Sequence, residues 1–407
     1  MADELPVLPP APLADLVREA AAAAPESVAV EAGGRAVTYW DLVGSADRLA
    51  DELREAGAGT VAVTGPCGIG FVVALLAAAA APVRLVTVDP GLPAARRVAM
   101  LETAAVDLVL ATDEASAIEA ASLNLVPAKE KKSTDTAERP GRVPICHLSP
   151  DGLSLAGPLP TVGPAGGSAT YVFFTSGTTG EAKAVLGRQA AAAHFVRWQR
   201  VRFLAGSGDR FAQLTGPSSD GLLRDVFTPL GAGATLCVAP ADVAVRPGGV
   251  TAWLSDAGIT AVHAVPSLAT RWLAAAGPAE PWSGLRLSFF AGEPLSDVTV
   301  SRWRERFPDT RVINLYGPPE TTLAKFCHEV GEPVPGIQPV GRPLPETDLR
   351  LVDGEVWIRT PYRTSTTRGK PTRGSSATAA RSGTAPATWV SWTTWASFAC
   401  AAGPVSR

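Results

Sequence analysis

The sequence lacks a charge excess, a long apolar run and a basic leader. Its formal net charge is −3, whereas nucleic-acid-binding proteins usually carry an excess of Lys and Arg. The nearest approach to a membrane span, Phe71 to Val83, is shorter than the roughly 18 apolar residues that a bilayer requires. The N-terminus has no basic-then-apolar layout of a secretory signal. We therefore expect a cytoplasmic protein that binds neither nucleic acid nor membrane.

Cysteine is scarce and irregularly spaced. The five cysteines are Cys67, Cys146, Cys237, Cys327 and Cys400. No pair has the short spacing of a zinc site, and the set does not suggest a disulfide framework. Any metal is therefore expected to arrive with a ligand. With 407 residues, 46% of them hydrophobic, the chain is long enough for a large core in one or two domains.

The first third of the chain alternates β-favouring and helical runs. Predicted strands at 60–64, 84–88 and 107–111 are separated by predicted helices at 68–81 and 93–103. Strands that alternate with helices form crossover units, so an α/β fold with a mostly parallel sheet is predicted. Residues 114–168 lose this pattern and are interpreted as a surface excursion.

Other elements are predicted from local pattern. A hairpin is expected at 27–39 around Gly33-Gly34. Helices are expected at 14–24, 40–56, 188–202 and 296–307, and strands at 260–265, 285–290 and 311–315. His194, inside the third of these helices, is interpreted as a histidine on a helix face without a catalytic part.

A glycine- and hydroxyl-rich loop follows a predicted buried strand that begins at Tyr171. Glycines let backbone N–H groups approach an anion, hydroxyls add donors, and a lysine adds a mobile positive charge. The loop residues are Thr175, Ser176, Gly177, Thr178, Thr179, Gly180 and Lys183. This spacing differs from a Walker loop, where Gly and Lys are adjacent. The residues predict a triphosphate-binding loop, although a plain surface turn would have a similar composition.

The strand at 311–315 runs into a second motif, Tyr316-Gly317-Pro318-Pro319-Glu320-Thr321-Thr322. A flat aromatic ring suits a purine, a carboxylate oxygen suits Mg²⁺, and a hydroxyl suits a phosphate oxygen. Taken alone, Glu320 would be an ordinary loop carboxylate.

Together the two motifs resemble those of the adenylate-forming (AMP-binding) enzymes, and most closely the adenylation domains of nonribosomal peptide synthetases. The first departs from the family pattern at Ala182, where Pro is usual, and at Ala184, where Gly is usual. Two weaker landmarks, 37–42 and 88–96, also look like the family and are assigned to scaffolding. The resemblance implies an α/β fold in which residues 1–363 form a large N-terminal domain with mixed, largely parallel sheets flanked by helices.

The resemblance also implies roles at a nucleotide site. Tyr316 would lie against the adenine, Glu320 would hold the Mg²⁺ that accompanies ATP, and Thr321 would meet the α-phosphate. Lys183 would neutralise the leaving pyrophosphate, so the predicted catalytic residues are Lys183, Glu320 and Thr321. Gly317 and the turn Ala291-Gly292-Glu293 complete the predicted nucleotide contacts.

Asp220 is predicted to pair with the ammonium group of an amino acid, because it falls where amino-acid-activating relatives carry an aspartate. Alternatively, Asp220 is an ordinary helix N-cap. The rest of the predicted substrate pocket is Gly221, Arg224, His263, Phe289, Ala291, Leu315, Leu323 and Ala324. Arg224 and His263 suggest a polar or acidic substrate side chain, unless Arg224 is an outward-facing charge beside Asp225.

The implied reaction is ATP-dependent activation of an amino acid to an aminoacyl-adenylate, with release of pyrophosphate. In relatives the adenylate passes to the phosphopantetheine thiol of a carrier protein, which here would act in trans. One alternative is an acyl- or aryl-CoA ligase, which Asp220 disfavours. Another is a catalytically inactive remnant that binds nucleotide or a partner protein without turnover.

The family resemblance breaks off near Thr364. Residues 364–407 carry neither the Thr-Gly-Asp motif nor the small C-terminal lid domain of the family, so the lid is predicted to be absent. This tail is interpreted as a disordered end or, preferably, as the product of a frameshift. Residues 381–395, back-translated with GC-rich codons and shifted one base, can encode Tyr-Arg-Thr-Gly-Asp-Leu-Gly-Glu-Leu-Asp-Asp.

Overall fold

The structure is a computed structural model that describes residues 12–123, 125, 142–162, 170–176, 182–276, 280–352, 355–362, 364–366 and 389–392. The helices are α1 Leu13–Ala23, α2 Tyr39–Glu55, α3 Ile69–Ala80, α4 Ala94–Thr103, α5 Glu114–Ser122, α6 Gln189–Phe203, α7 Gly221–Ala232, α8 Gly249–Asp256, α9 Pro266–Ala276 and α10 Asp297–Arg306. No helix among these residues is long and apolar enough to cross a membrane.

The strands of the first half are β1 Val28–Ala32, β2 Arg35–Thr38, β3 Thr60–Thr64, β4 Arg84–Val88, β5 Leu108–Ala111, β6 Ile145–His147, β7 Thr170–Ser176, β8 Ala182–Arg188, β9 Arg210–Gln213 and β10 Thr235–Val238. Those of the second half are β11 Ala261–Ala264, β12 Leu287–Ala291, β13 Arg311–Tyr316, β14 Phe326–Val330, β15 Arg342–Pro343, β16 Asp348–Val352, β17 Glu355–Arg359, β18 Ser365–Thr366 and β19 Trp389–Trp392.

These strands form two large sheets and one small one. The nine-stranded sheet has the order β15-β14-β13-β12-β11-β9-β10-β1-β2, and the seven-stranded sheet has the order β18-β8-β7-β4-β3-β5-β6. Strands β9 to β13 pair in parallel, as do β3, β4, β5 and β7. Both edges of the nine-stranded sheet and the β18 edge of the seven-stranded sheet are antiparallel, whereas the β6 edge is parallel. The predicted α/β class with mixed, largely parallel sheets flanked by helices is confirmed.

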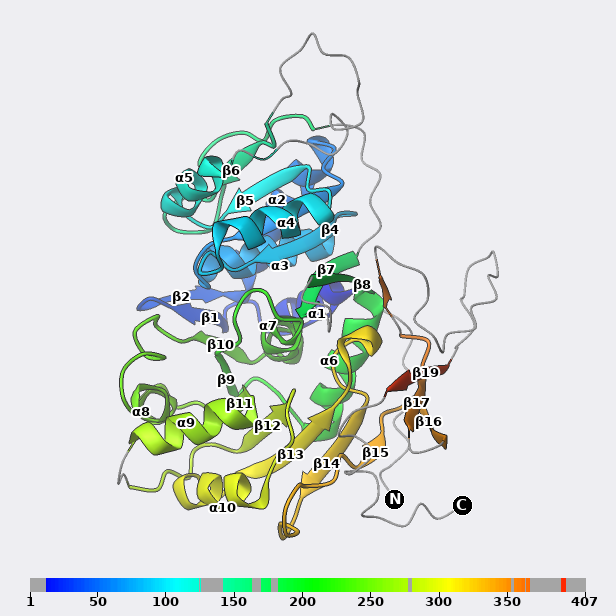
Figure 1. Ribbon diagram of the computed structural model, residues 1–407. Coiled ribbons are helices and arrows are strands. Elements are labelled where there is room, and N and C mark those ends of the chain that lie inside the picture. Colours follow the sequence, from blue (N-terminus) through cyan, green and yellow to red (C-terminus); the bar gives the residue numbers. More distant parts are fainter. Residues whose placement is uncertain are drawn as a thin grey trace.

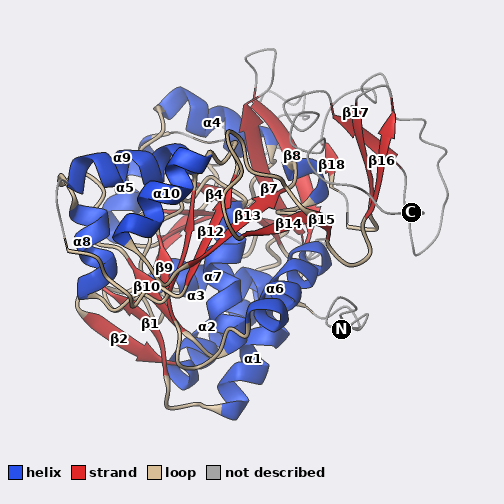
Figure 2. Ribbon diagram, turned by 90° about the horizontal axis from the view of Figure 1, so that it is seen from below, coloured by secondary structure: helices blue, strands red, loops and turns tan. Residues whose placement is uncertain are grey.

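The two large sheets share one hydrophobic core. Figure 1 shows the seven-stranded sheet with α2 to α5 in the upper part and the nine-stranded sheet below it, with β16, β17 and β19 to one side. Side chains of β1, β3 and β9 belong to the same buried cluster. Helix α3 lies within this core and is buried along its whole length up to Ala79, which explains why its sequence is apolar on every face. Figure 2 shows the helices packed around the strands.

Turn chemistry explains the hairpin of β1 and β2. These strands pair antiparallel, as predicted for residues 27–39. Gly33 and Gly34 have φ angles of 58° and 76°, which residues without a Cβ adopt at little cost. The landmark 37–42 is also structural: the Tyr39 hydroxyl is buried and donates to the carbonyl of Ala234 at 2.7 Å.

The interpretation of residues 114–168 as a surface excursion is wrong for two of its segments, which form regular secondary structure. Residues 114–122 form α5, and β6 pairs in parallel with β5 at the edge of the seven-stranded sheet. Alanine-rich and short elements lack the apolar periodicity on which the interpretation depended. In the tail, β18 pairs with β8 and β19 pairs with β17; apart from these two strands and Thr364, the tail residues lie outside the described part.

Candidate active site

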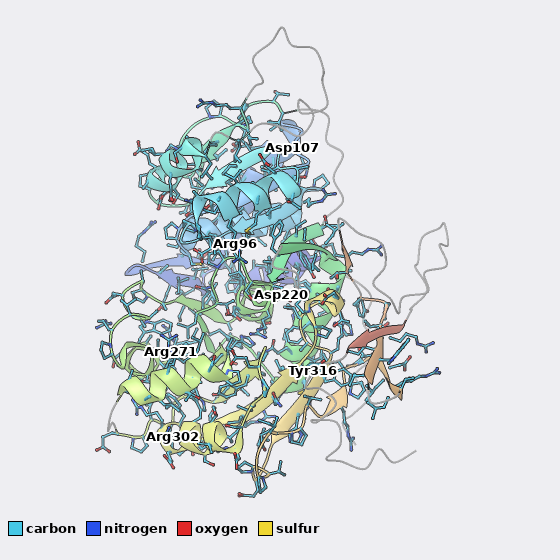
Figure 3. The ribbon with its side chains drawn as sticks, in the orientation of Figure 1. Arg96, Asp107, Asp220, Arg271, Arg302 and Tyr316 are labelled. Carbon is cyan, nitrogen blue, oxygen red and sulfur yellow. The ribbon has the colours of Figure 1, made fainter. Side chains whose placement is uncertain are left out.

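The predicted motifs follow the carboxyl ends of strands that pair in parallel within the two large sheets. β7 leads into the predicted phosphate loop, β9 leads toward Asp220, β12 ends at Ala291, and β13 ends at Tyr316. In open α/β sheets, ligands bind at this end of the strands. In Figure 3 Asp220 lies where the two large sheets meet, and Tyr316 lies below it.

The predicted phosphate loop joins two antiparallel strands. Thr175 pairs with Lys183 and Ser176 with Ala182, so the loop is the tip of a hairpin rather than a strand-to-helix turn. This geometry explains independently why the sequence departs from the Walker pattern, whose loop opens a helix. Gly177, Thr178, Thr179 and Gly180 lie outside the described residues, as do the side chains of Thr175, Ser176 and Lys183. Their roles remain predictions.

Tyr171 links the strand before this loop to the second motif. It pairs with Gly187 on β8, and a Cβ added to Gly187 would lie 2.0 Å from the Tyr171 ring. The missing side chain therefore makes room for the ring. The Tyr171 hydroxyl donates to the Thr322 hydroxyl at 2.9 Å. The two motifs, which are far apart in sequence, are thus joined by a buried hydrogen bond.

The second motif forms a tight turn after β13. Residues Pro319–Thr321 form a single 3₁₀ turn. Gly317 is required because an added Cβ would lie 2.3 Å from the carbonyl oxygen of Leu323. Thr321 is fully buried, and its hydroxyl donates to the carbonyl of Pro318 at 2.9 Å. Contact between the Thr321 hydroxyl and a phosphate would therefore need a change of rotamer, and this role remains a prediction.

Glu320 is half-buried within this turn. Among the described residues no group of three His, Cys, Asp or Glu side chains is arranged to hold a metal ion by itself. Mg²⁺ in nucleotide enzymes typically takes one or two carboxylates and completes its octahedron with phosphates and water. A lone carboxylate at the end of β13 fits that pattern, so Mg²⁺ at Glu320 is compatible with the residues present.

Asp220 lies at the start of α7 and is half-buried. It occupies the N-cap position, but its side chain makes no cap hydrogen bond of the usual kind, so capping alone does not account for the carboxylate. Burial raises the pKa of Asp220, while the Arg224 charge and the backbone N–H groups of Gly221 and Leu323 favour the ionised form. The Asp220 carboxylate therefore faces both α7 and the residue that follows the Glu320 turn.

Upstream of Asp220, the chain is fastened to the end of β4. The Thr87 hydroxyl donates to the carbonyl of Pro217 at 2.5 Å, and the backbone N–H of Asp89 donates to the Ser218 hydroxyl at 2.9 Å. Asp89, within the landmark at 88–96, thus helps to position the segment that carries Asp220.

Four predicted pocket residues share one face of the nine-stranded sheet. His263 pairs with Phe289 across β11 and β12, and Ala291 pairs with Leu315 across β12 and β13. Because alternate residues of a strand face the same side, Phe289 and Ala291 lie on one face. The His263 and Phe289 rings stack with centroids 4.8 Å apart. Gly221, Leu323 and Ala324 are buried as well.

His263 is the centre of a buried hydrogen-bond chain. Its Nδ1 lies 3.2 Å from Asp225 Oδ1, and its Nε2 lies 2.6 Å from Nε2 of Gln199, whose Oε1 accepts from Thr228 at 3.1 Å. An amide Nε2 can only donate, so His263 Nε2 accepts and the proton of the neutral ring is on Nδ1, which faces Asp225. This assigns the neutral tautomer, and burial correspondingly lowers the pKa of His263. A neutral His263 adds no second positive charge beside Arg224, and the predicted place of both residues in a substrate pocket remains a prediction.

Arg224 is buried, so the alternative of an outward-facing charge is also wrong. Only 8% of the residue is exposed, and its Nε lies 3.4 Å from Asp225 Oδ1. Burial raises the pKa of Asp225, but its hydrogen bond with His263 and the Arg224 charge outweigh burial and lower the pKa overall. Asp225 is therefore an ionised counter-ion of Arg224. The sequence singled out Arg224 and His263 but not the Gln199 and Thr228 partners, which come from α6 and α7.

Two further residues have clear contacts. Glu293 accepts from the backbone N–H and the hydroxyl of Ser267, each at 3.0 Å, and so fixes the start of α9 beside the turn at Gly292. Lys325 is fully buried, and its Nζ donates to the carbonyl of Thr322 at 3.1 Å. Sequence reasoning missed Lys325, although a lysine inside the apolar run Leu-Ala-Lys-Phe-Cys was an available signal.

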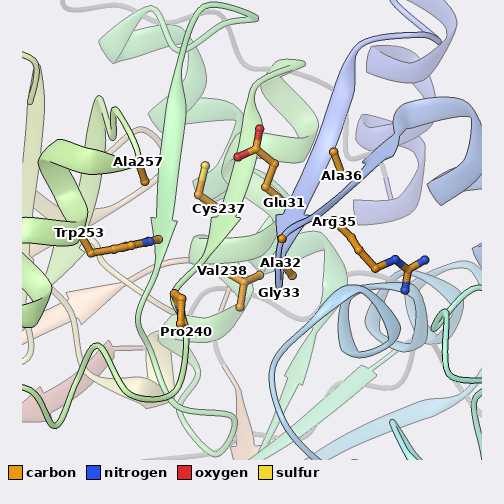
Figure 4. A pocket seen from close by; sticks show the side chains of 11 residues that line it. Glu31, Ala32, Gly33, Arg35, Ala36, Cys237, Val238, Pro240, Trp253 and Ala257 are labelled. Carbon is orange, nitrogen blue, oxygen red and sulfur yellow. The ribbon is translucent and has the colours of Figure 1, made fainter.

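A separate groove of about 380 Å³ lies beside the hairpin of β1 and β2 (Figure 4). Its lining includes Glu31, Arg35, Cys237 and Trp253 but no predicted site residue. Glu31 is already paired with the Arg210 guanidinium, at 3.0 Å and 2.5 Å. The groove is therefore distinct from the candidate active site.

Comparison with known proteins agrees with this geometry. Residues 17–368 match the family model described as AMP-binding enzyme. The chain is 34% identical over 363 residues to an isonitrile lipopeptide synthase of Streptomyces coeruleorubidus and 32% identical over 362 residues to the phosphinothricin tripeptide synthetase PhsB of Streptomyces viridochromogenes. These alignments cover 86% and 87% of this chain but 23% and 29% of the relatives. The chain thus spans about a quarter of the length of these curated relatives.

Solved structures of similar fold include the nonribosomal peptide synthetase FmoA3. Its α-methyl-L-serine-AMP-bound form is 25% identical, with a TM-score of 0.75 over 89% of this chain and 40% of FmoA3. The structure of IdnL7 is 27% identical, with a TM-score of 0.72 over 88% of this chain and 74% of IdnL7. From the family match over most of its length, the chain belongs to the AMP-binding enzyme family.

Proposed function

We propose that the chain activates the carboxylate of an α-amino acid with ATP. One carboxylate oxygen attacks the α-phosphorus, the bond from that phosphorus to the bridging β-phosphate oxygen breaks, and pyrophosphate leaves. The protein has little covalent work to do, so orientation and charge neutralisation supply the rate. Glu320 would hold Mg²⁺, which would neutralise charge on the phosphates. Lys183 would neutralise the leaving group from the hairpin loop.

Asp220 is the observation that carries the amino-acid assignment. It is a half-buried carboxylate without a cap hydrogen bond, beside Leu323 and next to the Glu320 turn. A carboxylate in such surroundings is suited to an ammonium group that arrives with the substrate. A plain acyl or aryl acid has no ammonium and would bring no opposite charge to the half-buried Asp220 carboxylate. This argument favours amino-acid activation over a CoA ligase.

The charges in the pocket favour an uncharged substrate side chain. The substrate ammonium would balance Asp220, Asp225 balances Arg224, and His263 is neutral. A carboxylate on the substrate side chain would then be an excess negative charge in a buried site, which is costly. We therefore expect neutral amino acids, including polar ones that accept a hydrogen bond from Arg224, to be preferred over aspartate and glutamate.

A carrier protein is the proposed acceptor. Two relatives are named as peptide synthases, and the bound form of FmoA3 carries an aminoacyl-AMP. An aminoacyl-adenylate is a reactive mixed anhydride that a thiol attacks readily. The acceptor would be a phosphopantetheine thiol on a separate protein, and the proposed setting is nonribosomal peptide biosynthesis in the cytoplasm.

The test is amino-acid-dependent ATP–pyrophosphate exchange by the full chain, with pooled amino acids. Asp220→Asn should lower exchange about 10- to 100-fold, the effect of removing one charge-assisted pair. Asp242→Asn is the matched control, because Asp242 is an exposed partner of Arg246 on the surface. Equal exchange by the Asp220 variant and wild type would refute the assignment. ATP-induced stabilisation without any exchange would instead support the non-catalytic alternative.

A further inference from the structure

The backbone of the turn that carries Glu320 has unusual φ angles. Directly after the 3₁₀ turn, Thr322 and Leu323 have φ angles of 64° and 54°. Positive φ is costly for residues with a Cβ, especially a β-branched one such as Thr322. Two consecutive residues in this region persist only when their surroundings hold them there. The turn is therefore a segment whose conformation depends on specific contacts.

Three groups from different parts of the chain make those contacts. The Tyr171 hydroxyl donates to the Thr322 hydroxyl at 2.9 Å, and Lys325 Nζ donates to the Thr322 carbonyl at 3.1 Å. The backbone N–H and the hydroxyl of Thr364 both donate to the Glu320 carbonyl, at 2.8 Å and 3.0 Å. Thr322, the strained residue, is thus held on both its side chain and its carbonyl.

The contact between Lys325 and Thr322 requires that a lysine amine be buried, which costs free energy. Its side chain is fully buried, with Nζ 5.6 Å from the centre of the Tyr362 ring. His194 of α6 stacks on the same ring at 4.2 Å, and Glu346 accepts from the Tyr362 hydroxyl. Burial lowers the pKa of Lys325 to about 7, and Glu346 opposes this shift only in part. Burial also lowers the pKa of His194 to about 3, so His194 is neutral.

A purely space-filling role does not account for Lys325. A methionine would occupy similar volume without the cost of burying an amine. What the amine provides is a donor for the Thr322 carbonyl, and with it a restraint on the backbone between Glu320 and Leu323. The same backbone brings the Leu323 N–H toward Asp220. One restraint therefore acts on both the nucleotide side and the amino-acid side of the site.

We propose that Lys325 is a positioning residue of the active site: it holds the turn 319–323 so that the Glu320 carboxylate and the Leu323 N–H keep their places. This proposal rests on the proposed function, because it takes Glu320 as the residue that holds Mg²⁺ with ATP. Loss of the restraint lets the turn relax toward ordinary backbone angles, which displaces Glu320 without removing any residue of the predicted phosphate loop.

The test is the ATP-induced rise in melting temperature of the full chain, measured with and without Mg²⁺ and converted to affinity. Lys325→Met should reduce the Mg²⁺-dependent part of ATP affinity about tenfold, the effect of one lost buried hydrogen bond. ATP affinity without Mg²⁺ should stay close to wild type. Arg97→Met is the matched control, because it also removes a buried cation, but one that pairs with Glu119 at 2.6 Å on α4 and α5.

Two milder variants keep the test decisive if Lys325→Met does not fold. Lys325→Gln retains an N–H donor and should recover part of the Mg²⁺-dependent affinity. Tyr171→Phe keeps the ring over Gly187 but removes the second bond to Thr322, and should lower the same quantity. Wild-type Mg²⁺-dependent affinity in the folded Lys325 variants would overturn the positioning role alone. A wild-type chain that does not respond to ATP and Mg²⁺ would refute the proposed function itself, and the positioning role with it.

Discussion

Replacing Lys325 by methionine should remove a pH dependence of stability from the chain. Burial lowers the pKa of the Lys325 ammonium from 10.5 to about 7 in the folded state. Between these values the unfolded chain binds a proton that the native chain has lost, so the free energy of unfolding rises with pH. Below pH 7 both states hold the proton, and the native state bears the full cost of burying the charge.

The size of the effect follows from the shift. A difference of one in pKa between the folded and unfolded states corresponds to about 1.4 kcal/mol. The free energy of unfolding of wild type should therefore rise by at most about 5 kcal/mol relative to Lys325→Met across this window. Methionine has no proton to lose and fills similar volume. Relative to wild type, the free energy of unfolding of the variant should therefore be highest at acidic pH, where wild type buries an ammonium. It should be lowest at alkaline pH, where the neutral amine of wild type still donates to Thr322.

The assay is urea unfolding of both proteins from about pH 6 to about pH 10, with the difference in unfolding free energy plotted against pH. Other titrating groups contribute equally to both proteins and cancel in this difference. A difference that rises through neutral pH supports the argument. A difference that is constant with pH would show that the Lys325 ammonium is not buried as the structure places it.

Two further substitutions test the packing around the site. Asp225→Ala should lower the free energy of unfolding by about 3–5 kcal/mol in urea unfolding, because it leaves Arg224 buried without its counter-ion; a loss below about 1 kcal/mol would contradict the ion pair. Gly187→Ala should lower the melting temperature and weaken ATP binding, because the new Cβ would lie 2.0 Å from the Tyr171 ring. An unchanged melting temperature would mean that the ring does not pack on Gly187.

Much of the fold follows from local pattern in the sequence. The strands β3, β4 and β5 and the helices α3 and α4 were predicted because apolar runs and helical spacing alternate there without interruption. α5 and β6 were not predicted, because an alanine-rich helix has a weak apolar stripe and a three-residue strand has almost no period. The edge position of β6 depends on pairing with β5, which is a tertiary contact.

The candidate site also depends on tertiary contacts that the sequence alone does not predict. The second motif stands out in the sequence because glycine, proline and a carboxylate cluster at the end of the strand predicted at 311–315, whereas Asp220 stands out only through the family resemblance. The charge state of His263 could not be predicted from the sequence, because it depends on a contact with Gln199 of α6. Likewise Lys325 gains its place through Tyr362 and Thr322. Partners that meet only in the folded chain decide the protonation of buried groups.

The most direct test of the central claim is to trap the product. The full chain would be incubated with ATP, Mg²⁺, pooled amino acids and hydroxylamine, and the aminoacyl hydroxamate and the phosphate products would be measured by mass spectrometry. We predict hydroxamates of amino acids with uncharged side chains, formed together with AMP and pyrophosphate and lost in Asp220→Asn. Release of ADP, or formation of AMP and pyrophosphate without dependence on an amino acid, would contradict the account.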